Sequence, residues 1–175
     1  YRREVDAALA VRPHLRRASA GESIPDFTPD TAKSFTRGES EYFFAGKRPG
    51  VASFDTPKAV GEYVGRVVRV EKNRFRLDRG GLLAAGDGIC FLTDRGFAGT
   101  NVNAADGDCV TPNRMEGIVP GTEVYRNYDH RFNQLLARSR TRRVIPASVL
   151  VEATAGGVRF SYTDCEGVTA SAARS

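Results

Sequence analysis

The sequence predicts a mainly β protein built around a small antiparallel barrel. Three observations support this fold class: short strands at regular spacing between residues 58 and 127, turns rich in Gly and Asp that separate them, and no helical pattern between them. The 175 residues are 41% hydrophobic and 27% charged, which suits one compact domain with appended pieces. No apolar run approaches the roughly 20 residues needed to cross a bilayer, so we expect no membrane span.

An N-terminal helix and an aromatic linker are expected over residues 1–57. Val5, Ala8 and Leu9 share one face of a helix, and Pro13 should kink or end its first part. Residues 21–34 are rich in turn formers and predict a loop with at most one helical turn. The rest of the linker has many Gly and Pro residues but also five rings, which we expect to pack on the barrel and on a neighbouring domain: Phe35, Tyr42, Phe43, Phe44 and Phe54.

Six strands form the predicted barrel over residues 58–127. A first hairpin is expected at 62–78, where Val alternates with Arg on either side of a short turn. A Gly-Asp-Gly turn at 86–88 then leads into a strongly apolar strand. The last four strands, separated by further turns, are expected at 89–92, 97–105, 109–112 and 123–127.

A helix and a β-hairpin are predicted over residues 128–175. The helix should run from 129 to 140, with Asp129 as its N-cap and an apolar face of Phe132, Leu135 and Leu136. Two strands joined at 155–157 follow it. An isolated hairpin is only marginally stable, so we expect this pair either to dock on the barrel or to begin a further domain.

Neither the cysteines nor the histidines suggest a catalytic or metal centre. Cys90, Cys109 and Cys165 are odd in number and far apart, which argues against disulfides and structural zinc and indicates the cytoplasm. His14 and His130 lie 116 positions apart. The turns at 86–88 and 106–108 are interpreted as hairpin turns rather than as sites for a metal or a phosphate. We therefore expect no catalytic residue and no cofactor in this chain.

One cluster of arginines exceeds the background charge. The net charge is +5, and residues 126–143 contribute all of it, with six Arg and one Asp. The six are Arg126, Arg131, Arg138, Arg140, Arg142 and Arg143. Two interpretations stay open: a stripe that follows a nucleic-acid phosphate backbone, or a solvated helix end paired with a neighbouring acidic surface.

Four ordered motifs and the closing segment 150–167 resemble one family. The chain is similar, over roughly residues 1–167, to the region that follows the catalytic domain in the collagenase-like peptidase family U32. The motifs are Phe35, Arg37 and Gly38; Thr56, Pro57, Lys58, Gly61, Glu62, Tyr63 and Gly65; Gly86, Asp87 and Gly88; and Tyr125, Arg126, Asn127 and Asp129. A looser pattern also resembles the small barrel that forms the second domain of translation elongation factors.

The resemblance implies a region without its own active centre. In the family, an N-terminal barrel of parallel strands carries a cysteine-containing signature, which nothing here matches. Several relatives hydroxylate ribosomal RNA, transfer RNA or a quinone precursor, some with an iron–sulfur cluster held by four Cys. The three scattered Cys of this chain depart from that requirement.

Three functions follow from the resemblance. The first is a non-catalytic accessory domain that packs on the catalytic domain of the same protein and assists substrate binding. The second is an RNA-binding module of an RNA-hydroxylating relative. The third is a domain that grips the substrate of a collagenase-like protease. Because the chain opens at Tyr1 without an initiator Met, we expect it to be part of a longer protein.

Overall fold

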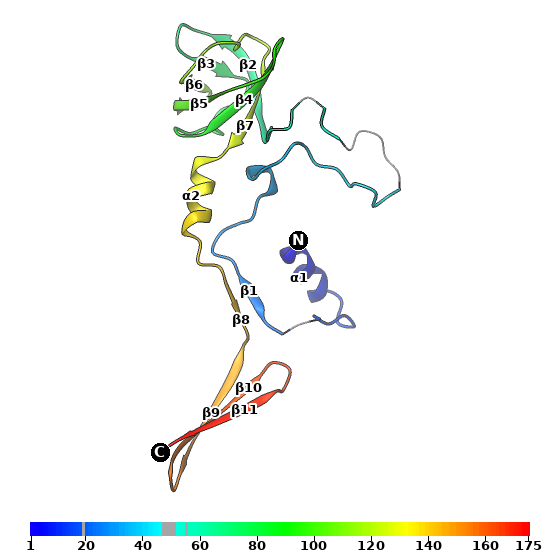
Figure 1. The fold of residues 1–175 in the computed structure, drawn as a ribbon, viewed down its shortest axis with the longest axis vertical. Helices are drawn as coiled ribbons and strands as arrows, with labels where there is room; N and C mark the ends of the chain where they lie inside the picture. The colour runs from blue at the N-terminus through cyan, green and yellow to red at the C-terminus, as the bar shows by residue number, and fades with distance from the viewer. Residues whose placement is uncertain (19, 47–51, 55) are drawn as a thin grey trace. The chain divides into compact units, whose positions relative to one another are not determined.

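The chain divides into two compact units. The computed structural model describes residues 1–18, 20–46, 52–54 and 56–175 (Figure 1). We call Phe27–Ser139 the barrel unit. Tyr1–Asp26 and Arg140–Ser175 together make up the second unit, which we call the terminal unit. The mainly β class predicted from the sequence is confirmed.

The barrel unit contains a closed antiparallel barrel of six strands in the order β2-β3-β6-β5-β4-β7. Each predicted barrel strand is present. Their bounds are β2 (Glu62–Val70), β3 (Phe75–Leu77), β4 (Gly88–Thr93), β5 (Gly96–Asp106), β6 (Cys109–Pro112) and β7 (Glu123–Tyr128).

Apolar side chains from every barrel strand fill its interior. β2 pairs with β7 at one end and β3 at the other, with register shifts at Tyr63/Gly65 and Val67/Arg69 that let one strand turn between two neighbours. The core cluster comprises Val64, Val67, Phe75, Leu77, Leu83, Ile89, Phe91, Val102, Val110, Ile118 and Val124. Because the barrel closes, all six strands have a partner on both sides.

A short helix, α2 (His130–Arg138), follows the last barrel strand. Asp129 is its N-cap, as predicted, and accepts a hydrogen bond from the backbone N–H of Phe132. Phe132 is the one buried residue of the helix, and its ring meets Phe27 edge-on with centroids 6.2 Å apart. Leu135 and Leu136, expected on the same apolar face, are 44% and 39% exposed.

The linker aromatics do not pack on the barrel, in contrast to the prediction. Phe44 and Phe54 are 95% and 91% exposed, and the other three rings are more than half exposed. Their neighbours are local: the Tyr42 and Phe43 rings lie 4.3 Å apart, and the Arg37 guanidinium lies over Phe35. The described part of the linker that carries them forms no helix or strand, so no regular face presses the rings against the barrel. Their expected packing on a further domain stays a prediction.

The terminal unit contains the N-terminal helix and two small sheets. The predicted helix is α1 (Arg2–Ala10). One sheet pairs β1 (Glu22–Ile24) with β8 (Arg142–Val144), joining residues from the two ends of the chain. The other contains β9 (Ala147–Thr154), β10 (Gly157–Asp164) and β11 (Thr169–Arg174), so a third strand extends the predicted hairpin. No hydrophobic side chain is buried in the described part of this unit.

Candidate functional site

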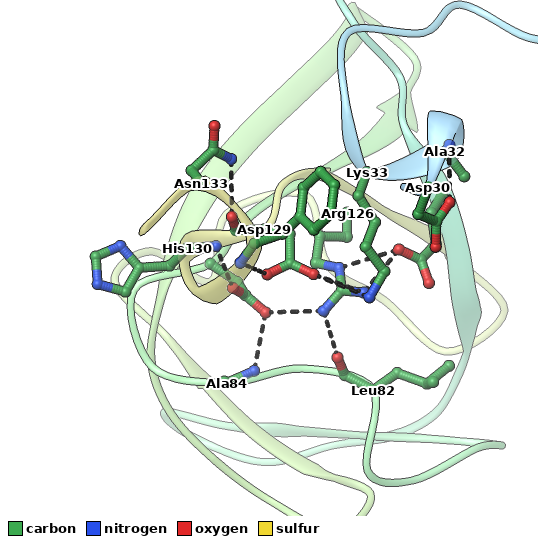
Figure 2. A network of polar contacts seen from close by, with 12 residues as sticks. Asp30, Ala32, Lys33, Leu82, Ala84, Arg126, Asp129, His130 and Asn133 are labelled. Atoms are coloured by element: carbon green, nitrogen blue, oxygen red, sulfur yellow. Dashed lines mark hydrogen bonds and ion pairs between the residues drawn. The ribbon is translucent and has the colours of Figure 1, made fainter. Parts of the chain in front are cut away.

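A buried network of charges joins the barrel to α2 (Figure 2). At its centre the guanidinium of Arg126, on β7, is only 7% exposed. It forms ion pairs with Glu62 of β2 at 2.7 Å, and with Asp87 and Asp129 at 3.3 Å each. Arg126 also donates a hydrogen bond of 2.6 Å to the carbonyl oxygen of Leu82. One side chain thus ties two strands, a turn and the start of a helix together.

Two carboxylates of this network meet the N-terminus of α2. Asp87 accepts hydrogen bonds from the backbone N–H groups of His130 and Ala84, both at 2.9 Å. Asp129 accepts from the N–H of Phe132 at 2.8 Å and pairs with the Lys33 ammonium at 3.3 Å. Negative charge is stabilising at this end of a helix, where N–H groups lack intrahelical partners. Both acids therefore position α2 on the barrel.

The network alters the proton affinities of its members. Burial opposes the charged form of Arg126, but the hydrogen bond and charge of Glu62, with the charges of Asp129 and Asp87, raise its pKa above the usual value. Burial likewise works to raise the pKa of Asp129. The N–H of Phe132, Arg126 and Lys33 outweigh that effect, so the pKa of Asp129 lies below its usual value. Both groups are thus held in their charged forms.

Three of the motifs that carry the family resemblance contribute to this network. Glu62 comes from the Gly-Glu-Tyr motif, Asp87 from Gly-Asp-Gly, and Arg126 and Asp129 from Tyr-Arg-Asn-x-Asp. The adjoining Gly61 has a φ of +81°, and a Cβ there would lie 2.0 Å from the carbonyl oxygen of Arg126. These motifs therefore specify how the barrel closes and carries its helix. Every carboxylate in the network faces a cation or a backbone N–H.

The structure separates the six predicted arginines into two groups. Arg126 is buried in the ion network and cannot reach a phosphate, which corrects its assignment as a nucleic-acid contact. Arg131 and Arg138 are exposed on α2, seven residues apart and so on one face of the helix. The remaining three are exposed in the terminal unit: Arg140, Arg142 and Arg143. Of these, Arg143 donates a hydrogen bond to the carbonyl oxygen of Ala20.

A polar hollow on the barrel was not predicted from the sequence. It has a volume of about 290 Å³ and is lined by Gly88, Ile89, Gly99, Thr100, Asn101, Asn113, Arg114 and Asn127. Three Asn residues thus line the hollow from β5, β7 and the loop after β6. They are scattered along the sequence as single Asn residues, and only the pairing of the strands brings them together.

The described residues contain no group of three or more His, Cys, Asp or Glu that could hold a metal ion. Cys90 is buried, and burial raises the pKa of its thiol to about 11, so it remains protonated at neutral pH. Cys109 is partly exposed and Cys165 is exposed. The ring of His130 packs on Gly86 and contacts the side chain of Gln134. No described helix is long and apolar enough to cross a membrane.

Comparison with curated proteins supplies a functional context. The chain is 32% identical over 178 aligned positions to the 23S rRNA 5-hydroxycytidine C2501 synthase of Escherichia coli (strain K12). The chain is similar to part of an rRNA-modifying enzyme. The match covers 97% of this chain, which spans 27% of the length of the synthase. No family model and no solved structure matches the chain.

Proposed function

We propose that this chain is an RNA-binding accessory region of an RNA-hydroxylating enzyme related to the peptidase U32 family. The observation that carries the proposal is the similarity, along nearly the whole chain, to about a quarter of an enzyme named for making 5-hydroxycytidine in 23S rRNA. An accessory role agrees with a barrel whose motif residues are engaged in structural ion pairs. The name of this relative gives no support to a role in gripping a protease substrate.

Exposed arginines supply the attraction to RNA in this proposal. Five of the six predicted arginines reach solvent, whereas Arg126 is neutralised inside the barrel unit. Arg131 and Arg138 make no ion pair with the described residues, so their charge is available to phosphates. Binding to a nucleic acid through such contacts gains free energy by releasing condensed counterions, and it weakens steeply as salt is added.

The exposed linker rings support a second part of the proposal, packing on a catalytic domain. Each aromatic ring buries 150–250 Å² when it is covered, a large gain at an interface between domains. Phe44 and Phe54 stand almost fully exposed, and no residue of the barrel covers them.

We assign the cytoplasm as the location, where free thiols stay reduced.

The test is RNA binding by the chain as a function of salt. We expect binding to a structured fragment of 23S rRNA whose logarithm falls linearly with the logarithm of the salt concentration. The slope of the logarithm of the binding constant against the logarithm of the salt concentration measures the number of phosphate contacts. A variant with Ala at the five exposed positions should make this slope less negative by up to roughly four. The five positions are Arg131, Arg138, Arg140, Arg142 and Arg143.

A charge-matched control separates a specific surface from net charge alone. It replaces five other exposed arginines with Ala: Arg12, Arg16, Arg79, Arg159 and Arg174. The proposal expects this control to keep most of the slope. An equal loss in both variants, or binding that does not respond to salt, would contradict the role assigned to these five arginines. Undetectable binding at low salt would contradict the proposed function.

A further inference from the structure

We infer that the polar hollow on the barrel wall binds one unpaired RNA nucleotide and reads its base, an inference that rests on the proposed function. The hollow lies between β5, β4 and β7 of the barrel unit. The exposed arginines on α2 and in the terminal unit supply attraction but no base recognition, because contacts to phosphates carry no sequence information. A site that reads a base needs donors and acceptors that the protein itself leaves unused.

Two of the residues that line the hollow are glycines. Gly88 lies on β4, the strand between β5 and β7, and pairs with Asn101 of β5 and Tyr128 of β7. At this point β4 therefore has no side chain between its two neighbouring strands. A Cβ at Gly88 would lie 2.9 Å from Oδ1 of Asn127, so a larger residue would press against that amide. Gly99, on β5, is exposed and adds to the opening.

The walls of the hollow are held by backbone contacts. The N–H of Asn113 donates to the carbonyl oxygen of Asn101 at 2.7 Å, and the N–H of Arg114 donates to Oγ1 of Thr100 at 3.0 Å. The loop after β6 is therefore fixed to β5 next to the hollow. A site whose walls are already ordered pays less conformational entropy when a ligand binds.

The amides themselves have no partner. Within the described part of the chain, the side chains of Asn101, Asn113 and Asn127 make no hydrogen bond, although the backbone N–H of Asn113 donates to the carbonyl oxygen of Asn101. Each amide offers two donors and an acceptor, the complement of a base edge. Three such groups around one hollow can distinguish one base from another, since each base presents a different pattern of donors and acceptors.

The charge and size of the hollow favour RNA over other ligands. Its eight lining residues, all described, include one cation, Arg114, and no acid. Its volume of about 290 Å³ is near the lower end of the range for ligand pockets. An adjoining hollow of about 480 Å³ shares Arg114 and contains Phe97, a ring on which the next base can stack. Its lining also includes Arg95 and two acids, Asp94 and Glu116, so the positive charge that favours RNA is confined to the smaller hollow. Amides, one guanidinium and a nearby ring form the set used by proteins that bind single-stranded RNA.

The experiment compares short single-stranded RNAs that differ only in base. Fluorescein-labelled octamers of adenylate, cytidylate or uridylate, and an octamer alternating guanylate with uridylate, are titrated with the whole chain at one salt concentration. We expect at least a roughly fivefold spread in Kd between the strongest and weakest octamer, the smallest effect of one good base contact. The double variant Asn101→Ala/Asn113→Ala should remove this spread. Its salt slope should remain unchanged, because no charge is lost.

Asn103→Ala is the matched control. It removes the same amide from the same strand, two residues away and outside the hollow, and should keep the spread. The three substituted residues, Asn101, Asn103 and Asn113, are all exposed. The variants should therefore unfold at the same urea concentration as the parent chain. A base preference that survives in the double variant, or equal affinity for all octamers, would overturn this inference and leave RNA binding intact. Failure of every octamer and of structured rRNA to bind would overturn the proposed function as well.

Discussion

Arg126 places a full positive charge in the barrel unit at a point where three carboxylates converge. A buried charge is expensive to remove from water, and it is tolerated because each N–H of the guanidinium that faces the interior has an acceptor. Removing the cation leaves the carboxylates without compensation. The carboxylate of Asp87 is fully buried, so it would lose the most electrostatic stabilisation.

Arg126→Met should therefore lower the free energy of unfolding by about 3–5 kcal/mol, the usual cost of breaking a buried ion pair. The measurement is urea denaturation followed by circular dichroism. Arg131→Met is the control, because Arg131 is exposed and forms no ion pair with any residue that the structure describes. Its effect should stay within about 0.5 kcal/mol. Similar midpoints for both variants would show that the network does not stabilise the barrel.

Asp129 makes stability depend on acid. Its pKa is lower in the folded chain than in the unfolded chain, so folding favours its ionised form. This contribution is complete above the unfolded pKa of about 3.9 and is lost as the pH falls through the lower, folded pKa. Urea midpoints should thus drop as the pH falls below about 4.

Asp129→Asn tests that assignment, because Asn still caps a helix but carries no charge. The variant should be less stable than the parent at pH 7, and the two curves should converge at low pH. Asp106→Asn is the control, since that carboxylate is exposed and makes no hydrogen bond or ion pair with the described residues. Parallel curves for the parent and Asp129→Asn would contradict the prediction.

The partners of Arg126 could not be predicted from the sequence, although Arg126 and the three carboxylates that pair with it all lie in recognised motifs. Glu62 and Arg126 are 64 positions apart, and β2 and β7 bring them together with a register shift at Tyr63/Gly65. Alternation of apolar and polar residues predicts which face a side chain takes, but not a register that changes along a strand. The sequence pattern therefore groups Arg126 with the surface arginines, whereas in the structure three carboxylates neutralise its charge inside the barrel unit.

At the level of elements, local patterns predicted most of the structure. Alternation of apolar and polar residues, together with Gly-Asp turns, predicted all six barrel strands. The cap of α2 was predicted because Asp129 precedes a run with helical apolar periodicity. Two features were missed, the pairing of β1 with β8 and the strand β11. β11 has the sequence TASAAR, whose Ala and Ser residues have little strand propensity, and it is ordered by pairing with β10.

The nine residues of α2 are too few to remain helical alone in water. Its cap and one buried side chain, Phe132, hold it on the barrel unit. Phe132→Ala should therefore open the helix and expose the bonds after Arg131 and Arg138 to trypsin. Leu135→Ala, which removes a side chain that is already 44% exposed, should not.

Mass spectrometry of peptides released during brief trypsin treatment measures this effect. Faster cleavage at both sites in Phe132→Ala, with slow cleavage within the barrel strands, is the expected result. Equal rates in both variants would mean that the cap alone keeps α2 in place.

For the whole molecule, the hydrophobic core is confined to one unit. Every buried hydrophobic side chain of the described residues lies between positions 64 and 132, inside the barrel unit. The terminal unit keeps its sheets by backbone pairing, while Val149, Leu150 and Val151 of β9 are all more than half exposed. Burial of apolar surface is the main source of folding free energy, so the two units should differ widely in local stability.

Hydrogen exchange on the intact chain tests this difference. Amides of β4 and β7 should exchange only by global unfolding, because the barrel has no free edge to open. Paired amides of β9, β10 and β11 should exchange far faster, through local opening that exposes little new apolar surface. Low concentrations of urea should speed exchange in the barrel strands more steeply, since their opening exposes the larger area. Equal protection and equal urea dependence in both sets would mean that the two units unfold as one cooperative body.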